Sequence, residues 1–331
     1  MKRPSKYNFA NTPTPIHKLE HLSSLLKKNI CIKRDDLTGV LVTGNKIRKL
    51  EYVIQDAIDL KADTIVTCGG LQSNHVRTTT IISRTLGLNP VAVLRGEEPP
   101  VFEGNTLLTA IFSDEIIYVT EDEYNNIEQV YSDLDKKFRK RGLIPYFIPE
   151  GASNTLGCWG YISMMEELDK QLKELDLKFD SIFVALGSGG TQAGMILGKY
   201  LTGNTANIFG VNVFKVTREF EEHISYLCTD AIKQYGFPFE YNKNDLHILN
   251  DYIGNGYAKT TDKEMKLFID LAVKESIIFD QVYTGKAVFG MIDQLENHPG
   301  SYGENILFIH TGGLFGLFPE KERITNLLRN K

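Results

Sequence analysis

The segment SIFVALGSGGTQAG, residues 181–194, decides the fold class of this chain. Its first part, Ser181–Leu186, is largely apolar on both faces, as parallel strands covered by helices usually are. The glycine-rich turn Gly187–Gly190 follows, and the apolar residues Met195–Leu197 continue into a helix. A strand, a glycine loop and a helix in this order are typical of α/β proteins. The turn offers backbone N–H groups and a helix N-terminus, which together suit an anion.

Strand-like and helix-like segments alternate along the rest of the chain. We predict strands at Ile30–Lys33, Thr64–Cys68, Pro90–Leu94, Ile116–Val119, Tyr146–Pro149, Ser181–Leu186, Ile208–Val213 and Asn305–His310. We predict helices at Lys46–Leu60, Asn74–Leu86, Asn154–Leu175, Asp262–Glu275, Lys286–Glu296 and Phe315–Asn330. This alternation predicts an α/β protein with one or two parallel sheets.

Glycine-rich loops follow three of the predicted strands, at residues 69–70, 187–190 and 312–313. Because ligands of parallel sheets bind outside the carboxyl ends of the strands, we expect the three loops to meet at one ligand cleft. The loop at 187–194 is not a dinucleotide fingerprint, since Gln192 stands where the third glycine belongs, and no Gly-Lys-Ser/Thr follows it. A small phosphate ester fits it better, and a tight structural turn is the alternative.

Composition narrows the function classes. The chain has 331 residues, of which 42% are hydrophobic and 24% are charged, so it can bury a large core without metals or disulfides. The net charge of −5 argues against a nucleic-acid partner. The four cysteines lie far apart and form no CxxC pair, which predicts buried, reduced thiols and no metal site. No segment has the pattern of a signal peptide or a membrane span, so we expect a cytoplasmic protein without a membrane partner.

The segment GNKIRKLE, residues 44–51, opens a helix with the three cations Lys46, Arg48 and Lys49 in its first turn. The helix dipole disfavours cations there by roughly 0.3–1 kcal/mol each. One interpretation is a solvated cluster offset by the nearby acids. The other is a pocket for an anionic ligand, in which a lysine flanked by cations has a lowered pKa and is ready for Schiff-base formation.

Other candidates stand at the starts of elements. Ser73 and Asn74 follow Gly69-Gly70 and either cap the next helix or meet a ligand carboxylate. The nearby His75 is left unassigned, because a histidine there is more often part of the core. The chain has no GxSxG and no HExxH motif, which removes two common hydrolase readings.

Five motifs together resemble the D-cysteine desulfhydrase and 1-aminocyclopropane-1-carboxylate deaminase family of pyridoxal-phosphate enzymes. They are KRDDLTG (33–39), GNKIRKLE (44–51), GGLQSNH (69–75), GSGGTQAG (187–194) and VYTGKA (282–287). The resemblance extends from about residue 12 to the C-terminal helix, in matching order. It implies a tryptophan-synthase-β-like fold with two parallel-rich, three-layer α/β/α domains and the cofactor cleft between them. Residues 1–45 and 153–331 would form the larger, cofactor-binding domain and residues 46–152 the smaller one, in a homodimer.

The resemblance also implies roles for single residues. Lys46 would form the Schiff base with pyridoxal 5'-phosphate, the glycine loop and Lys49 would hold the phosphate, and Ser73 would meet the substrate carboxylate. Cofactor contacts are expected at Lys46, Lys49, Asn74 (phenolic oxygen), Gly187, Ser188, Gly189, Gly190, Thr191, Thr284 and Thr311 (pyridine nitrogen). Catalytic roles are expected at Lys46, Ser73, Tyr257 and Tyr283.

One departure separates the branches of the family. The deaminases resemble Tyr-Glu-Gly-Lys where this chain has Tyr283-Thr284-Gly285-Lys286. A carboxylate near the pyridine nitrogen strengthens the electron sink for ring opening, whereas β-elimination needs less help. Thr284 therefore favours a lyase that converts D-cysteine to pyruvate, hydrogen sulfide and ammonia. Lys46 would remove the α-proton and Tyr283 would protonate the thiolate.

Other functions stay open at this point. Within the family, the chain could be a 1-aminocyclopropane-1-carboxylate deaminase, or a lyase for L-cysteine, cysteate, serine or diaminopropionate. From other classes, it could be a non-catalytic protein that binds a phosphate ligand, or a nicotinamide oxidoreductase. A chemically special Lys46 disfavours the former, and Gln192 disfavours the latter.

Overall fold

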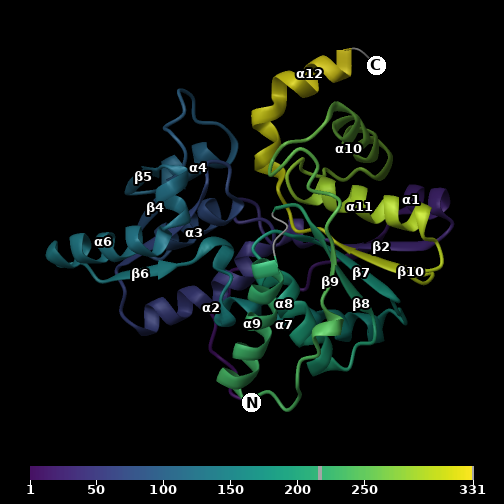
Figure 1. Ribbon diagram of the computed structural model, residues 1–331, viewed down its shortest axis with the longest axis horizontal. Coiled ribbons are helices and arrows are strands. Elements are labelled where there is room, and N and C mark those ends of the chain that lie inside the picture. Colours follow the sequence, from purple (N-terminus) through teal and green to yellow (C-terminus); the bar gives the residue numbers. More distant parts are fainter. Residues whose placement is uncertain (215–217, 330–331) are drawn as a thin grey trace.

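The computed structural model describes residues 1–214 and 218–329, and it builds them around two sheets (Figure 1). The larger sheet has the order β1 (Ile16–Lys18), β2 (Asn29–Lys33), β10 (Asn305–Ile309), β7 (Ser181–Leu186), β8 (Asn207–Asn212), β9 (His247–Leu249). The smaller has the order β5 (Glu115–Val119), β4 (Asn89–Arg95), β3 (Thr64–Gly70), β6 (Pro145–Ile148). All pairings are parallel except that of β1 with β2. The predicted α/β class with parallel-rich sheets is confirmed.

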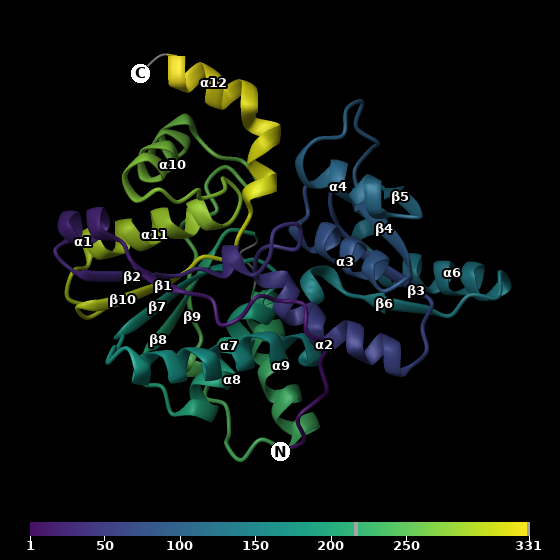
Figure 2. The same cartoon turned by 180° about the vertical axis from the view of Figure 1, so that it is seen from behind.

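Helices cover both faces of the larger sheet (Figures 1 and 2). One face carries α7 (Thr155–Glu174), α8 (Gly190–Thr202) and α9 (Arg218–Tyr235). The other carries α1 (Glu20–Leu26), α10 (Asp262–Glu275) and α11 (Thr284–Asn297). Strand β7 shows why its sequence is apolar throughout: Ile182 and Val184 pack into the first layer, while Phe183 and Ala185 pack into the second.

The smaller sheet packs against α2 (Asn45–Asp59) and α3 (Asn74–Thr85) and, on its other side, against α6 (Ile127–Lys140). The short helices α4 (Gly104–Phe112) and α5 (Glu121–Asn125) complete this half of the molecule. All four of its strands come from residues 64–148, inside the predicted smaller domain. The domain boundaries at 45/46 and 152/153 stay a prediction. Among the described residues, no helix is long and apolar enough to cross a membrane.

All eight predicted strands are present, with ends displaced by at most two residues. Strands β1 and β9 were not predicted, because three residues are too few to show a pattern. The single helix predicted at Phe315–Asn330 is wrong. The chain forms a 3-10 segment, η4 (Leu314–Glu320), before α12 (Lys321–Arg329), and Pro319 lies at that junction, where it cannot continue a regular helix. Asn330 lies outside the described residues.

A buried network of charges anchors the first turn of α2 to the larger sheet. The Arg48 guanidinium donates to both oxygens of Asp35, at 2.9 and 2.8 Å, and to Glu167 of α7 at 2.8 Å. Lys33 at the end of β2 donates to the same Glu167 at 2.6 Å. Burial alone would raise the pKa of both carboxyls, but the neighbouring cations outweigh it and hold each pKa below its ordinary value. The stability that these two groups supply is therefore present above the ordinary carboxyl pKa and is lost as the pH falls through the lowered one.

Replacing Glu167 by Gln should test this anchor, because it leaves Arg48 and Lys33 buried with less compensating charge. We expect Glu167→Gln to lower the free energy of unfolding by about 3 kcal/mol in urea titrations. The matched control is Glu166→Gln, which breaks an exposed pair with Arg3 and should cost less than about 1 kcal/mol. Equal losses in the two variants would show that the network does not anchor the fold.

Candidate active site

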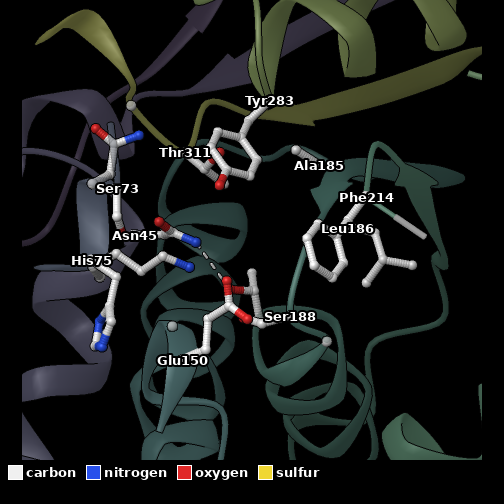
Figure 3. Close-up of a pocket in the computed structure, with 17 residues that line it drawn as sticks. Asn45, Ser73, His75, Glu150, Ala185, Leu186, Ser188, Phe214, Tyr283 and Thr311 are labelled. Atoms are coloured by element: carbon white, nitrogen blue, oxygen red, sulfur yellow. Dashed lines mark hydrogen bonds between the residues drawn. The ribbon is translucent and has the colours of Figure 1, made fainter. Parts of the chain in front are cut away.

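The carboxyl ends of both sheets meet at one pocket, as the glycine loops predicted (Figure 3). Nine of the predicted site residues line it: Lys46, Ser73, Asn74, Gly187, Ser188, Gly189, Thr191, Tyr283 and Thr311. Four others lie behind its wall rather than on its surface: Lys49, Gly190, Tyr257 and Thr284. The expected loop at 69–70 is instead the end of β3, where a Cβ on Gly69 would lie 2.6 Å from the Ser73 hydroxyl oxygen. That glycine makes room for Ser73.

Lys46 is the half-buried amine of this pocket, placed there by the first turn of α2. Burial lowers the pKa of Lys46 to about 8, and the nearby Glu150 acts in the opposite direction. The predicted lowering is present, but the predicted cause is wrong. Desolvation lowers the pKa of Lys46, not the flanking cations, because carboxylates neutralise Arg48 and burial also lowers the pKa of Lys49.

Lys49 forms the base of an anion cradle. Its amine is fully buried and donates to the hydroxyl of Ser153 at 2.8 Å. Ser153 in turn lies 2.7 Å from the hydroxyl of Ser188 and accepts the N–H of Gly190 at 3.3 Å. Burial and then the charge of Lys46 lower the pKa of Lys49. In the described parts of the chain, no carboxylate pairs with Lys49, so a ligand anion would supply the missing charge.

The glycine loop completes the cradle. Gly189 has φ +87°, a conformation that favours glycine, and a Cβ on Gly190 would lie 2.7 Å from the Lys49 amine. Helix α8 starts at Gly190, and the Thr191 hydroxyl accepts from Asn45 at 3.1 Å (Figure 3). Backbone N–H groups, a helix N-terminus and a buried lysine fit a phosphate group.

Ser73 and Asn74 each keep donors for a ligand. Ser73 caps α3, since its oxygen accepts the N–H of Val76 at 3.2 Å, but its hydroxyl proton has no protein acceptor in the described residues. The Asn74 side-chain oxygen accepts from Asn105 at 3.1 Å and from Arg77 at 3.3 Å. Because that oxygen is occupied, the amide NH₂ of Asn74 is the group left for the pocket. The capping alternative is thus confirmed for Ser73 without excluding a ligand contact.

Tyr283 and Tyr257 are hydrogen-bonded to each other through their phenol groups. Burial, followed by the neighbouring Tyr257, raises the pKa of Tyr283 well above its ordinary value. Burial also raises the pKa of Tyr257 to about 12. Both phenols therefore stay protonated at neutral pH, so one proton forms their shared hydrogen bond and the other is left to donate, while Tyr257 holds the Tyr283 ring in place.

Thr284 lies at the start of α11, beside a buried carboxylate. Its hydroxyl donates to Asp280 at 2.7 Å and accepts the Asp280 N–H at 2.9 Å. Asp280 also accepts the backbone N–H groups of Val282, Tyr283 and Thr284 at 2.8 to 2.9 Å. A carboxylate is therefore buried beside Thr284, with both oxygens occupied by these donors.

Sequence reasoning missed several residues of the site: Asn45, Arg77, Glu150, Ser153, Phe214 and Asp280. Two carried a usable signal. Glu150 follows the end of β6, and the carboxyl ends of parallel strands were already expected to line the pocket. Ser153 lies just before α7. Arg77 and Asp280 carried none, because their importance depends on contacts distant in sequence.

Residues 7–312 match the family described as "Pyridoxal-phosphate dependent enzyme". A putative 1-aminocyclopropane-1-carboxylate deaminase of Thermotoga maritima is 42% identical, over 94% of this chain and 97% of its own. A mitochondrial bifunctional D-cysteine desulfhydrase/1-aminocyclopropane-1-carboxylate deaminase of Arabidopsis thaliana is 37% identical, over 98% of this chain and 82% of its own. A crystal structure described as an ACC deaminase homologue has a TM-score of 0.88 at 34% identity, covering 98% of this chain and 97% of its own. The fold implied by the five motifs is confirmed.

The lowered pKa of Lys46 can be measured directly in protein freed of any ligand. Competitive acetylation followed by mass spectrometry should give a midpoint near pH 8 for Lys46. The same lysine in a free peptide of residues 44–51 should react with a midpoint about 2 units higher, because it is fully solvated. A midpoint in the folded protein equal to that of the peptide would contradict the desolvation of Lys46.

Proposed function

Because the chain belongs to the family of pyridoxal-phosphate-dependent enzymes, we propose that it is the lyase that releases hydrogen sulfide from D-cysteine. Pyridoxal 5'-phosphate is the cofactor of this family. The observation that carries the proposal is the pairing of a half-buried amine, Lys46, whose pKa is about 8, with an anion cradle centred on Lys49. An amine with a pKa of about 8 has a much larger neutral share near physiological pH than an ordinary lysine and can bond an aldehyde, while the cradle takes a phosphate.

The described residues fit the cofactor. Gly187–Thr191 and Lys49 would hold its phosphate, Lys46 would bond its aldehyde carbon, and the Asn74 amide would donate to its phenolic oxygen. Thr311 would lie toward the ring nitrogen. When bound, the cofactor supplies an electron sink that stabilises negative charge at the α-carbon of an attached amino acid.

The protein groups then direct a β-elimination. The free hydroxyl proton of Ser73 orients the substrate carboxylate. The Lys46 amine would take the α-proton, and its lowered pKa raises the share of the neutral, proton-accepting form. The Tyr283 phenol gives its proton to the departing sulfur, and Tyr257 keeps that phenol in position. The C–S bond breaks as the α-proton is removed, and water then hydrolyses the released imine, so D-cysteine and water give pyruvate, hydrogen sulfide and ammonia.

The environment of Thr284 supports elimination over ring opening. Its hydroxyl is fully engaged with Asp280 and is not a charged partner for a ring nitrogen. A glutamate in its place would meet the Asp280 carboxylate, so this buried pocket suits a threonine. Deaminase activity on 1-aminocyclopropane-1-carboxylate stays the alternative within the family.

We also propose a cytoplasmic homodimer with the two domains predicted above. Exposed apolar side chains support a second copy: Leu107 and Ile111 of α4 are 43% and 61% exposed, and Leu314 and Phe318 of η4 are 42% and 52% exposed. The two elements pack against each other, so the four side chains come from adjoining segments of one part of the surface.

A non-catalytic phosphate-binding protein is disfavoured, because such a protein has no use for the lowered pKa of Lys46.

Replacing Lys46 by Ala should test the chemistry. Borohydride should fix the cofactor covalently to the wild-type protein but not to Lys46→Ala. Elimination should fall by roughly 10³-fold or more, because the variant lacks both the bonding amine and the base. Lys263→Ala, which removes an exposed lysine of α10, is the control. Covalent trapping that persists in Lys46→Ala would disprove the assignment.

A substrate panel tests the proposed reaction itself. The wild-type protein is given D- and L-cysteine, serine, cysteate, diaminopropionate and 1-aminocyclopropane-1-carboxylate. Sulfide and pyruvate should form fastest from D-cysteine, and 2-oxobutyrate should form slowly or not at all from the cyclopropane. Fast release of 2-oxobutyrate would favour the deaminase instead.

The Thr284→Glu variant tests whether a threonine at this position favours β-elimination over deamination. The new carboxylate would lie beside Asp280, and two buried like charges repel by several kcal/mol. We expect elimination from D-cysteine to fall by at least about tenfold, with partial recovery in Thr284→Glu/Asp280→Asn. Unchanged elimination and unchanged deamination in Thr284→Glu would remove the support that Thr284 gives to the lyase.

A further inference from the structure

Few of the side chains that line the pocket can carry a charge. Among its 17 lining residues, only Lys46 and Glu150 have side chains that can hold a full charge, apart from His75. Burial and the charges of Lys46 and Lys49 push the pKa of His75 well below its ordinary value, so that ring is neutral. Once Lys46 is engaged by the cofactor, Glu150 is the remaining side chain on the described pocket surface that readily carries a full charge.

Glu150 lines the pocket from the connection between β6 and α7. Its segment is the 3-10 turn Glu150–Ala152, in which Gly151 packs so closely that a Cβ there would lie 3.3 Å from the Lys46 amine. Figure 3 shows Tyr283 across the pocket from Glu150, and the Glu150 charge acts on the phenols of Tyr283 and Tyr257. In the proposed elimination Tyr283 protonates the leaving group, so a carboxylate that acts on Tyr283 would also act on the β-substituent of a bound amino acid.

Two further groups bear on the Glu150 carboxylate, and neither cancels it. Arg95 at the end of β4 attracts it, but this guanidinium already pairs with Glu121 at 3.3 Å and lies over the rings of Tyr124 and Tyr257. Burial raises the pKa of Glu150, and Tyr124, Arg95 and Lys46 each act in the opposite direction. A half-buried carboxylate without its own salt bridge in the described residues repels a second anion and attracts a cation.

We propose that Glu150 is a specificity residue that makes this pocket accept amino acids with a neutral or cationic β-substituent and reject those with an anionic one. The inference rests on the proposed function, since it concerns the substrate of that site. It divides the open substrates by charge: a thiol, a hydroxyl or an ammonium group is accepted, whereas a sulfonate or a carboxylate is excluded.

The test uses the cofactor-loaded enzyme and three ligands of similar size. D-2,3-diaminopropionate, D-serine and D-aspartate differ mainly in β-charge, and their L-forms serve as a parallel set. Dissociation constants are taken from the change in cofactor absorbance at mildly alkaline pH, which favours the ionised carboxyl, and kcat and KM are measured separately. The variants are Glu150→Gln, Glu150→Asp as the charge-retaining rescue, and Glu121→Gln as the matched control on the exposed partner of Arg95.

In the wild type, diaminopropionate should bind about tenfold or more tightly than aspartate, as expected for one charge across a few ångströms of partly wet protein. Glu150→Gln should abolish that ranking, while Glu150→Asp and Glu121→Gln should keep it. A wild-type enzyme that binds aspartate as well as diaminopropionate, or an unchanged ranking in Glu150→Gln, would overturn the inference. If no amino acid changes the absorbance or yields a keto acid, the proposed function itself fails, which is a separate result.

Discussion

The ion pair between Arg48 and Asp35 is the interaction on which the rest of the site depends. Both groups are almost fully buried, and the carboxylate also accepts from Tyr161 at 2.7 Å. A cation in the first turn of a helix opposes the dipole, and here a buried carboxylate offsets that cost. Because Arg48 is fixed in this way, the same turn can hold Lys46 toward the pocket and Lys49 toward the glycine loop. One helical turn thus places three cations in three different environments.

Close backbone packing holds that turn from its other side. Gly160 of α7 faces the carbonyl of Arg48, and a Cβ at this position would lie 2.5 Å from it. A similar approach joins α7 to α8, since a Cβ on Gly194 would lie 2.3 Å from the carbonyl of Cys158. These two glycines set the spacing between the helix that carries the amine and the helix that begins at the phosphate loop. The distance between the Lys46 amine and the glycine loop is therefore set by helix packing and not by the loops.

Local pattern predicted much of this structure. The eight longer strands, the glycine loop and the placement of Lys46, Ser73 and Tyr283 around one pocket depend on short runs of residues that pack the same way in many proteins. The sequence pattern could not predict which partners the three cations have, because only the fold brings Glu167 to Arg48 and Ser153 to Lys49. For the same reason it found the lowered pKa of Lys46 but not its cause. Burial is a sum over distant segments, and no single segment records it.

The chain passes between the two sheets twice on its way through the smaller one, at Gly44-Asn45 and at Glu150–Ser153, and both passages contribute to the pocket wall or the cradle behind it. A ligand held by both passages therefore ties the two halves together without a covalent bond. By mass action, a ligand that binds only the folded state adds about 2.7 kcal/mol to its stability at 100 times the dissociation constant. Resistance of this protein to heat and to proteolysis is thus set in part by how much cofactor the cell provides. The supply of the cofactor and the lifetime of the protein are therefore linked through the equilibrium of cofactor binding to the folded state.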